Sequence, residues 1–559
     1  MRERREFLKS AGVGLLGTRV GHRPGSLPSS VEDWYQVRGV EPPRFGRKKG
    51  VTGTQGMAIA SHPIVTRTAI DILRAGGNAC DAILAASVAQ TVAEPHMTTI
   101  TGVLSMLYFD RATGRTTYIN GGMNAPLAKL PGFSVADLRT GRGAGVPGFW
   151  GGFEAALAKH GTMARPALLK PAIDLARNGF PIHPFLYAEM FSQLDTIGIT
   201  EAGRRIYMPQ GTLLLPGELL RQTEAADTLE RLAADGSKFF YHGEFARKYC
   251  EVVKAAGGVI TPADLERYEA RHDQPARSSY RGYDVIASPP PDNGGTHVIE
   301  ALNMMELLDI PKWGPADQSP DTLYHMIRIH NEVFTAGGRQ TDPASHRVPL
   351  EVIVSKEYAR MRLDLLRMGD PPAADKPAPP PGSNHLTVVD GKGNVATVLH
   401  SVMALPWSNG LFVGGFGIAA SGGHFLRVMP NPGDRASAYV APVLMLKGGK
   451  PVLACGSPSV GLLANILQNI VNVFDLGSGI EAAVHRPRFG GVYLAPGNYI
   501  EADVPEKVQN AVTARGVPLN VCSPWHFMNG SFEGIVLDPT TGTMSACGDP
   551  RRNATAEAV

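Results

Sequence analysis

Hydrophobic residues recur along this chain with two different periods. Apolar positions three and four residues apart predict amphipathic helices, whereas alternation of apolar and polar positions predicts strands. The predicted helices cover residues 64–75, 79–92, 153–159, 166–177, most of 219–257, and 461–475. The predicted strands cover residues 104–109, 116–119, 386–399, 441–447 and 451–455, with a closing hairpin formed by 534–538 and 543–547. The pattern indicates an α+β chain whose strands are concentrated after residue 383.

A proline-rich segment, residues 368–382, interrupts this pattern. It ends in Pro379-Pro380-Pro381-Gly382-Ser383-Asn384-His385 and opens directly into the alternating run that starts at Leu386. Proline-rich segments are extended linkers, and the chain can be cut in such a segment without breaking a core. Taken alone, Gly382 and Ser383 are also the residues of an ordinary turn.

Ser383 follows this linker at the start of a strand, where its hydroxyl is placed to attack the carbonyl group of Gly382. The attack would cut the chain between Gly382 and Ser383 and leave Ser383 with a free α-amine. Such an amine has an ordinary pKa of about 7.7 to 8.0 and can act as base for the hydroxyl of the same residue. Ser383 would then begin a second fragment of 177 residues, 383–559.

Composition excludes several classes of function. The 559 residues carry a formal net charge of only +3 at pH 7, without a basic run beyond the N-terminus, which argues against nucleic-acid binding. No apolar run approaches the roughly 18 residues that a membrane span needs. The five cysteines, at widely scattered positions, lack the spacing of a disulfide framework or a zinc site and are interpreted as buried thiols. No metal or organic cofactor is predicted.

The N-terminus, residues 1–30, has the features of an export leader. Arg4-Arg5-Glu6-Phe7-Leu8-Lys9 precedes a modestly apolar stretch, residues 11–17, as in twin-arginine signals. A basic tail without a targeting role is the alternative. The pattern favours export in the folded state, to the periplasm or beyond.

From about Gly56 to the C-terminus, a series of short blocks in a fixed order resembles the γ-glutamyltranspeptidase family of N-terminal-nucleophile hydrolases. The blocks before the linker are residues 56–63, 76–82, 94–96, 146–148, 159–163, 255–258, 261–265, 280–283 and 289–295. Those after it are residues 388–394, 456–458, 487–489 and 548–552. The resemblance implies a four-layer αββα sandwich in which segments 31–382 and 383–559 share one core and stay associated after cleavage.

The resemblance also implies roles for residues around the cut. Ser383 stands where the family has a threonine nucleophile in Thr-Thr-His. Ser401, 18 positions later, takes the place of a threonine whose hydroxyl bonds the nucleophile. The backbone N–H groups of Ser459 and Val460 replace those of a glycine pair that binds the oxyanion. His385 and His400 adjoin these residues and are interpreted as structural.

The positions that hold a γ-glutamyl group in the family differ here. Gly122 stands in place of an arginine, Ala438 and Tyr439 in place of two serines, and Phe425 with Leu426 in place of an acidic pair. Loss of these charged contacts predicts a different acyl group, because sites built on such contacts discriminate strongly. The substrate-pocket candidates are Gly122, Met403, Trp407, Phe425, Ala438 and Tyr439. Arg427 and Arg435 are the residues left to hold a carboxylate placed differently.

The sequence therefore predicts an exported, self-cleaving amidohydrolase or acyltransferase that acts on a small-molecule amide other than a γ-glutamyl one. Two alternatives remain open at this point: a true γ-glutamyltransferase or glutathione hydrolase, and a non-catalytic binding protein with the same fold. Release of glutamate from glutathione would identify the first alternative, and persistence of an uncut chain would identify the second.

Overall fold

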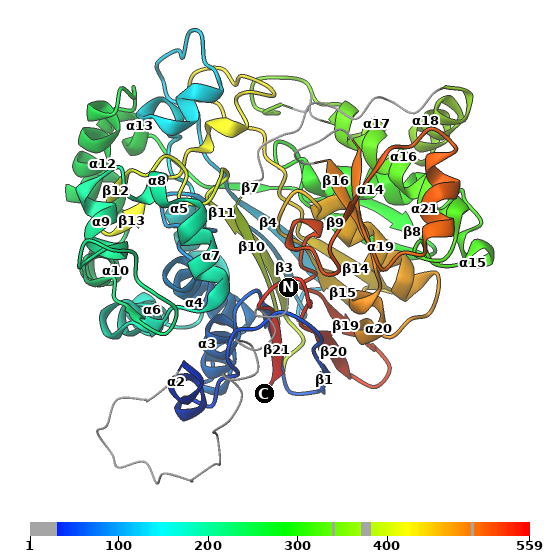
Figure 1. Ribbon diagram of the computed structural model, residues 1–559, viewed down its shortest axis with the longest axis horizontal. Coiled ribbons are helices and arrows are strands. Elements are labelled where there is room, and N and C mark those ends of the chain that lie inside the picture. Colours follow the sequence, from blue (N-terminus) through cyan, green and yellow to red (C-terminus); the bar gives the residue numbers. More distant parts are fainter. Residues whose placement is uncertain (1–30, 338–340, 370–381, 493–496) are drawn as a thin grey trace, which may run out of the picture.

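The computed structural model of the protein describes residues 31–337, 341–369, 382–492 and 497–559 (Figure 1). The predicted export leader at 1–30 and residues 370–381 of the proline-rich linker lie outside the described residues. Gly382 and Ser383 lie within them, so the predicted cleavage point is part of the structure.

Two seven-stranded sheets form the centre of the molecule, and within each sheet all neighbouring strands are antiparallel. The first sheet runs in the order β1 (Gly50–Gly53), β20 (Met544–Cys547), β19 (Ile535–Leu537), β15 (Lys450–Cys455), β14 (Val443–Lys447), β9 (Tyr283–Ala287) and β8 (Ala276–Tyr280). The second runs in the order β21 (Thr555–Ala558), β2 (Met57–Ala60), β10 (Ser383–Val389), β11 (Val395–Ser401), β3 (Val103–Asp110), β4 (Arg115–Gly121) and β7 (Arg271–Asp273).

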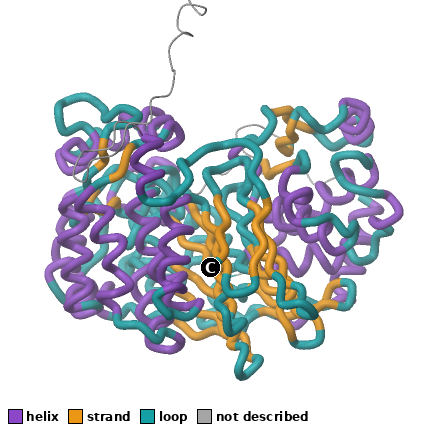
Figure 2. The backbone as a smooth tube through the Cα atoms, turned by 90° about the horizontal axis from the view of Figure 1, so that it is seen from below, coloured by secondary structure: helices purple, strands orange, loops and turns teal. Residues whose placement is uncertain are grey.

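The helices lie in two groups on opposite sides of the strands, as Figures 1 and 2 show. The first group is α2 (Val31–Val37), α3 (Pro63–Arg74), α4 (Ala79–Ala93), α5 (Phe149–His160), α6 (Arg165–Asn178), α7 (Pro184–Ser192), α8 (Leu194–Ile197), α9 (Glu201–Tyr207), α10 (Thr223–Asp235), α11 (Ser237–His242), α12 (Glu244–Ala255) and α13 (Pro262–Glu266). The second group is α14 (Gly294–Met305), α15 (Ile310–Trp313), α16 (Pro320–Gly337), α17 (Leu350–Ile353), α18 (Lys356–Met368), α19 (Leu462–Phe474), α20 (Ile480–His485) and α21 (Glu506–Thr513).

Three apolar clusters fill the spaces between these elements. One lies between the second sheet and the helices α3 to α6, and another lies between the first sheet and α14, α16, α18 and α19. The third joins the facing sides of the two sheets, for example through Ile59 and Leu107 on one sheet and Leu444 and Ile535 on the other. Burial of this apolar surface is the main force that holds the elements together.

Short elements complete the chain. They are β5 (Phe180–Pro181) with β6 (Leu219–Leu220), β12 (Phe412–Val413) with β13 (Phe416–Gly417), and β16 (Phe489–Val492) with β17 (Asn498–Glu501) and β18 (Leu519–Cys522). The 3₁₀ turns are η1 (Val135–Arg139), η2 (Gly141–Gly143), η3 (Ser421–Gly423) and η4 (Phe527–Asn529).

Most predicted elements appear within a few residues of their expected bounds, and the exceptions have local causes. The alternating run 386–399 is a hairpin, because Asp390 accepts hydrogen bonds from the backbone of Lys392 and Asn394 and forms a turn there. The helical region 219–257 is three helices, because Gly236 takes a φ of 53° and Gly243 separates the next two. Glycine reaches such angles at little cost and so ends helices.

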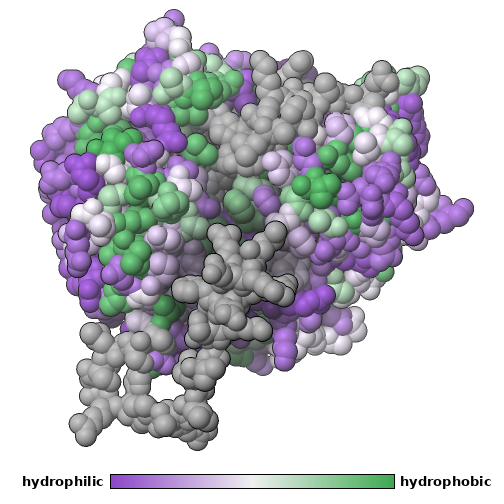
Figure 3. Space-filling model, viewed as in Figure 1, coloured by the Kyte–Doolittle hydropathy of each residue, from purple (hydrophilic) through white to green (hydrophobic). Residues whose placement is uncertain are grey.

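The distribution of polar surface and of cysteines is that of a folded protein with a buried core. Figure 3 shows hydrophilic side chains along the outer helices at both edges of this face, with apolar patches between them. All five cysteines are free; Cys80, Cys250, Cys455 and Cys547 are buried, and Cys522 is partly exposed. Among the described residues, no helix combines the length and the apolar character that crossing a bilayer requires.

Candidate active site

Ser383 is the first residue of β10, in the middle of the second sheet. The residue is 4% exposed, and its Oγ accepts a hydrogen bond from the backbone N–H of Ser459 at 3.1 Å. Its own carbonyl oxygen accepts from the Arg552 guanidinium at 3.4 Å. A backbone donor therefore fixes the Ser383 hydroxyl, and the strand pairing fixes the backbone of this residue.

Ser401 ends β11 and pairs directly with Ser383 in the register of the hairpin. Its hydroxyl donates to the carbonyl oxygen of Gly382 and accepts from the backbone N–H of Met403 at 2.7 Å. The Gly382 N–H in turn donates to the carbonyl of Ala404. Ser401 therefore contacts the carbonyl of the bond between Gly382 and Ser383, and a donor there polarises this carbonyl.

The loop 456–461 connects β15 to α19; the backbone N–H of Ser459 reaches Ser383, and Val460 lines the space beside it. Ser459 takes a φ of 75° and its hydroxyl donates to the carbonyl of Met528 at 2.8 Å. Helix α19 starts at Leu462 immediately after this loop. N-terminal N–H groups of a helix carry partial positive charge, so this end of α19 favours a developing oxyanion.

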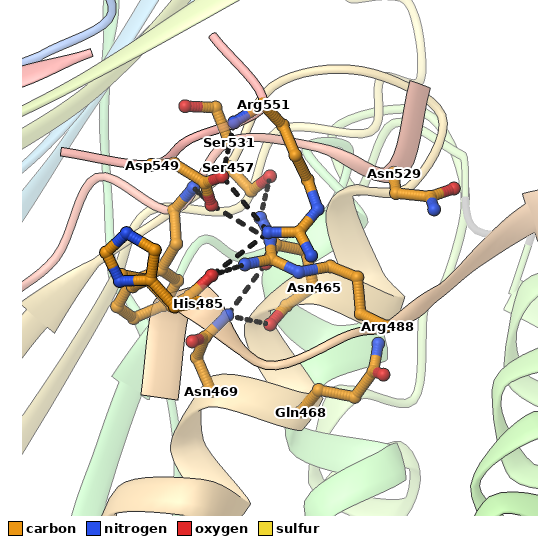
Figure 4. Close-up of polar contacts among 12 residues, drawn as sticks. Ser457, Asn465, Gln468, Asn469, His485, Arg488, Asn529, Ser531, Asp549 and Arg551 are labelled. Carbon is orange, nitrogen blue, oxygen red and sulfur yellow. Dashed lines mark hydrogen bonds and ion pairs between the residues drawn. The ribbon is translucent and has the colours of Figure 1, made fainter. Parts of the chain in front are cut away.

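A buried polar cluster braces this loop from below (Figure 4). Asn465 donates to the Ser457 hydroxyl at 2.8 Å and accepts from Arg488, which pairs with Asp549 at 2.9 Å. Arg551 pairs with the same carboxylate at 3.3 Å. Burial alone would raise the pKa of Asp549, but the two guanidinium groups together with backbone N–H donors from Phe532 and Arg551 outweigh burial and lower it. Paired, hydrogen-bonded charges of this kind tolerate burial, and here they fix the loop that carries Ser459.

A small pocket opens over Ser383, with about 550 Å³ of empty space when its opening to solvent is counted, and we call it the nucleophile pocket. One end of it is formed by Ser383, Ser401 and the loop 456–461, and most of its remaining wall is apolar. It is lined by Gly294, His297, Phe334, Ser383, Leu399, Ser401, Met403, His424, Arg427, Tyr439, Ser459, Val460, Leu462 and Leu463. An amide whose carbonyl lies at Ser383 would place an apolar group against this wall.

The mouth of the nucleophile pocket carries a stacked group of aromatic and basic side chains. The Arg427 guanidinium lies over the rings of Tyr439 and Phe334, at 4.2 and 4.8 Å from their centroids. Burial, together with the nearby charge of Arg427, lowers the pKa of His424 to about 3. His424 is therefore neutral at ordinary pH, and the positive charge at this mouth belongs to Arg427.

Gly122 and Arg435, two of the predicted substrate contacts, lie together in the core and do not line the nucleophile pocket. The Arg435 guanidinium donates to the carbonyls of Gly122 and Asn120, at 2.9 and 3.0 Å, and to the Tyr268 hydroxyl. Arg435 is 1% exposed, and a Cβ at Gly122 would stand 3.0 Å from its Cδ. Of the two arginines singled out from the sequence, Arg427 is the one at the pocket.

Only some of the other predicted pocket residues line the nucleophile pocket. Met403 and Tyr439 line the nucleophile pocket, whereas Trp407, Phe425 and Ala438 do not. Trp407 is buried and donates from Nε1 to the Tyr207 hydroxyl at 2.8 Å. Phe425 packs near Phe133, and the backbone of Ala438 bonds that of Pro291. These three side chains support the surroundings of the pocket.

The two histidines next to the serines point away from the pocket. The His385 ring bonds Thr397 at 2.7 Å and fills the space beneath Gly456, where a Cβ would overlap the ring. The His400 ring faces α4 and bonds Gln90 at 2.9 Å. Burial lowers the pKa of both rings to about 3. Neither is placed to take a proton from Ser383.

Sequence reasoning missed several lining residues, notably Phe334, His297, His424 and the pair Leu462 and Leu463. They come from α16, α14, the segment after η3, and α19, which are far apart in the chain. His297 follows the Gly294-Gly295 block closely, and this proximity is the one local signal that could have identified it.

In the described part of the chain, no group of three or more His, Cys, Asp or Glu side chains is arranged to hold a metal ion.

Comparison with known proteins places the chain among enzymes of one family. The sequence model described as gamma-glutamyltranspeptidase matches residues 65–559. The glutathione hydrolase proenzyme of Bacillus subtilis (strain 168) is 28% identical over 95% of this chain and 95% of its own length. The acylase ACY 1 proenzyme of Pseudomonas sp. (strain V22) is 31% identical over 92% of this chain and 95% of its own length. The crystal structure of cephalosporin acylase from Bacillus halodurans superposes with a TM-score of 0.81 at 26% identity and covers 97% of this chain and 99% of that one.

Proposed function

The chain belongs to the γ-glutamyltranspeptidase family of amidohydrolases and acylases, and on that premise we propose that it is an exported, self-cleaving amidase with Ser383 as its N-terminal nucleophile. The observation that carries the proposal is the position of Ser383. It opens a central strand at the base of a pocket, and its Oγ accepts from the Ser459 N–H at 3.1 Å. The relatives named above are proenzymes, which supports a precursor that is cut.

Self-cleavage in this proposal is an N-to-O acyl shift between two adjacent residues. Ser383 Oγ attacks the carbonyl carbon of Gly382 while the Ser401 hydroxyl holds the carbonyl oxygen. A new C–O bond forms, the C–N bond breaks, and the proton of the hydroxyl passes to the leaving nitrogen. Water then hydrolyses the ester, which leaves a carboxylate on Gly382 and a free α-amine on Ser383.

Turnover of a substrate amide uses the same hydroxyl in its mature form. The α-amine takes the Oγ proton as Oγ attacks the substrate carbonyl, and the N–H groups of Ser459 and Val460 bind the oxyanion. The amine product leaves with that proton, and an acyl ester remains on Ser383. Water attacks this ester to release the acid, or a second amine attacks it to give a transfer product.

The proposed acyl group is apolar and differs from γ-glutamyl. Leu399, Leu462 and Leu463 form the inner wall of the nucleophile pocket, where an ammonium or carboxylate would lose its hydration. Gly122 and Ala438, which stand at positions of charged-group contacts in the family, do not line it. The similarity to an acylase proenzyme supports the same conclusion. Similarity to a glutathione hydrolase, and Arg427 at the mouth, keep γ-glutamyl amides as the second candidate.

We further infer that the stacked sheets and their outer helices form the four-layer αββα arrangement of N-terminal-nucleophile hydrolases. Residues 31–382 and 383–559 would then be the two associated fragments of the mature enzyme. The second sheet supports this, because it combines β10, β11 and β21 with strands from before the cut.

The proposal of export rests on the twin-arginine pattern at Arg4 and Arg5. If an Arg4→Lys, Arg5→Lys double variant still reached the periplasm, the twin-arginine pattern would no longer support the proposal of export.

The first experiment is the intact mass of denatured, purified protein beside that of Ser383→Ala. We expect two chains for the wild type, the second beginning at Ser383, and one chain for the variant. Ser87→Ala, at a buried serine of α4 outside the nucleophile pocket, serves as the control and should be cut. A wild type that stays whole would exclude the self-cleaving amidase and leave the non-catalytic binding protein.

The second experiment compares acyl groups on one leaving group. Hexanoyl, phenylacetyl and γ-glutamyl 4-nitroanilides are offered to the cleaved protein, and release of 4-nitroaniline is followed. We expect kcat/KM for an apolar amide to exceed that for the γ-glutamyl amide by at least about tenfold, since burial of a charge without a partner is costly. The opposite order, with glutamate released from glutathione, would establish the second candidate.

A further inference from the structure

Three buried histidines gather near the start of β10, and we call them the histidine cluster. His62 precedes α3, His96 follows α4, and His183 precedes α7. The rings of His62 and His183 lie 5.3 Å apart between centroids. The cluster reaches the predicted cut, because a Cβ at Gly382 would lie 3.1 Å from the His96 carbonyl oxygen. None of the three histidines lines the nucleophile pocket.

The hydrogen bonds of two of these rings determine which nitrogen carries the proton. Nδ1 of His62 accepts from the backbone N–H of Ile64 at 3.2 Å, and Nδ1 of His183 accepts from that of Leu186 at 3.3 Å. Burial keeps both rings neutral, because it lowers the pKa of each. A neutral imidazole has one accepting and one donating nitrogen, so Nε2 carries the hydrogen in both. Neither Nε2 has a hydrogen-bond partner among the described residues, and the same holds for both ring nitrogens of His96.

These N–H groups suit an anion or a water molecule better than a metal ion. A metal would need the lone pair of Nε2, but the bonds to the helix N-termini already use the lone pair of Nδ1 and leave the hydrogen on Nε2. His62 and His183 are the N-caps of α3 and α7, which have 12 and 9 residues. The N-terminal end of a helix carries partial positive charge, so two such ends favour an anion here.

Arg552 adds a full positive charge that lacks a counter-charge. It is 2% exposed, its guanidinium donates to the Ser383 carbonyl at 3.4 Å, and its Nε has no partner among the described residues. The adjacent Arg551 is paired with Glu501 at 2.6 Å and with Asp549 at 3.3 Å. Arg552, in contrast, forms no ion pair within the described part of the chain. A buried charge without a partner is strongly unfavourable.

The carboxyl groups near Arg552 do not neutralise it. Burial raises the pKa of Glu94 to about 7 and that of Glu533 well above 4.5, although the charge of Arg552 opposes both shifts. Both groups therefore hold protons at mildly acid pH. Glu189, on α7, also has a raised pKa through burial, and its side chain is partly exposed to water. The charge of Arg552 also contributes to the lowered pKa of His96, after burial and His183, which connects the guanidinium to the histidine cluster.

We propose that the histidine cluster and Arg552 bind one small monovalent anion, such as chloride. The N–H groups at Nε2 of His62 and His183 and at Nε of Arg552 would donate to it, and the anion would neutralise the guanidinium. Asn384 offers a further N–H group, because its buried side chain has no partner among the described residues. Arg552 contacts the carbonyl of Ser383, so the anion would help to fix the first residue of β10 from outside the nucleophile pocket.

Thermal unfolding at constant ionic strength tests this site without any need for catalysis. Sodium chloride is exchanged for sodium gluconate, whose anion is too large for a site that accepts a single small ion. We expect the Tm of the wild type to rise by about 1 °C for each tenfold increase in chloride above the dissociation constant. His62→Asn and His183→Asn keep an acceptor for the helix N-terminus but lack the Nε2 donor, and they should lose most of this rise.

The matched control is His526→Asn. His526 is the N-cap of η4, where its Nδ1 accepts from the Met528 N–H at 3.4 Å, and it lies outside the histidine cluster. This variant should keep the wild-type response to chloride. A wild type whose Tm is the same in chloride and gluconate would overturn the inference, and so would an equal chloride response in the wild type and in both cluster variants.

Crystals soaked in sodium bromide identify the ligand directly. Anomalous scattering at the bromine edge should show a peak beside Arg552 and the rings of His62 and His183, and no peak there in His183→Asn. Ordered water at this position without an anomalous peak would show that water pairs these donors, and the inference would then be wrong. Neither experiment requires self-cleavage, so the anion site and the proposed amidase function are tested separately.

Discussion

At Ser459, a side chain occupies a backbone conformation that glycine adopts at far lower cost. The resemblance places Ser459 and Val460 where the family has a glycine pair. Ser459 has a left-handed φ of 75°, and its hydroxyl donates to the Met528 carbonyl. A left-handed L-residue costs roughly 1–2 kcal/mol, so this loop stores strain next to Ser383 and the hydrogen bond offsets part of it.

Replacing Ser459 by glycine and by alanine separates these two contributions. Both variants lose the hydrogen bond to Met528, but only glycine relieves the strain. We expect Ser459→Gly to be more stable than Ser459→Ala by about 1 kcal/mol, measured as the free energy of unfolding in denaturant. Equal stabilities would show that the angle at this position is not strained.

Ser401 contacts the Gly382 carbonyl, and self-cleavage should depend on that contact. Removing one donor from an oxyanion commonly costs about 10²–10³ in rate. We therefore expect Ser401→Ala to slow the appearance of the 383–559 fragment by at least about tenfold, followed by gel or mass over time. Ser401→Thr keeps the hydroxyl and should be cut at a rate much closer to that of the wild type. Full-speed cleavage of Ser401→Ala would rule out the role.

Among the elements, α4 shows how a helix is tied to the nucleophile strands. All fifteen of its residues, Ala79–Ala93, are buried, and its many alanines allow close packing. Gln90 bonds His400 on β11 and also Glu94, which follows the last turn. Burial raises the pKa of Glu94 to about 7 even though Arg552 is nearby. The end of α4 thus carries a carboxyl that is protonated in the folded state at mildly acid pH.

This carboxyl gives stability a defined pH dependence. The folded state binds the Glu94 proton up to about pH 7, whereas the unfolded chain releases it near 4.5. The contribution of Glu94 to stability is therefore full below about pH 4.5 and is lost as pH rises to 7. We expect the wild-type free energy of unfolding minus that of Glu94→Gln to fall by up to about 3 kcal/mol across this window.

The difference between the two proteins is the quantity to measure, because the many buried histidines titrate in the same range with the opposite sign. His62, for example, has a pKa well below 6.5 through burial, so its contribution is lost as pH falls. Unfolding curves from pH 4.5 to 8 are compared pairwise. Parallel curves for wild type and Glu94→Gln would contradict the raised pKa.

On the scale of the whole molecule, the two segments on either side of the predicted cut are woven into common sheets. In the second sheet β10 pairs with β2, and β11 pairs with β3. In the first sheet β14 pairs with β9, and β20 pairs with β1. Each partner in these pairs comes from the other segment. A cut between Gly382 and Ser383 would therefore leave the hydrogen bonds and the apolar core between segments in place.

The two fragments of the cleaved protein should consequently behave as one folded unit. We expect them to elute together in size-exclusion chromatography and to unfold in one cooperative thermal transition, since neither sheet is complete without both. Addition of moderate salt should leave them together, because the contact is mostly apolar. Separate elution of a 383–559 fragment, or two independent transitions, would be incompatible with this arrangement.

The sequence by itself determined most of the helices and strands, and it singled out Ser383 as the candidate nucleophile. Periodicity located the helices 64–75 and 79–92 and the strands around Ser383, because helix and strand repeats are local properties of the chain. Ordered motifs identified the family, and they pointed to Ser401 and to the loop at Ser459, which the structure places in contact with Gly382 and Ser383.

Only the tertiary structure decided which side chains line the pocket over Ser383. Met403 and Tyr439 line the nucleophile pocket, whereas Trp407, Phe425 and Ala438 pack elsewhere. Arg427 lines the pocket and Arg435 is buried in the core, although the two are only eight positions apart. His297, His424 and Phe334 come from separate elements that meet only when the sheets and helices pack. A pocket is a relation between distant segments, and a single sequence carries no local signal for such a relation.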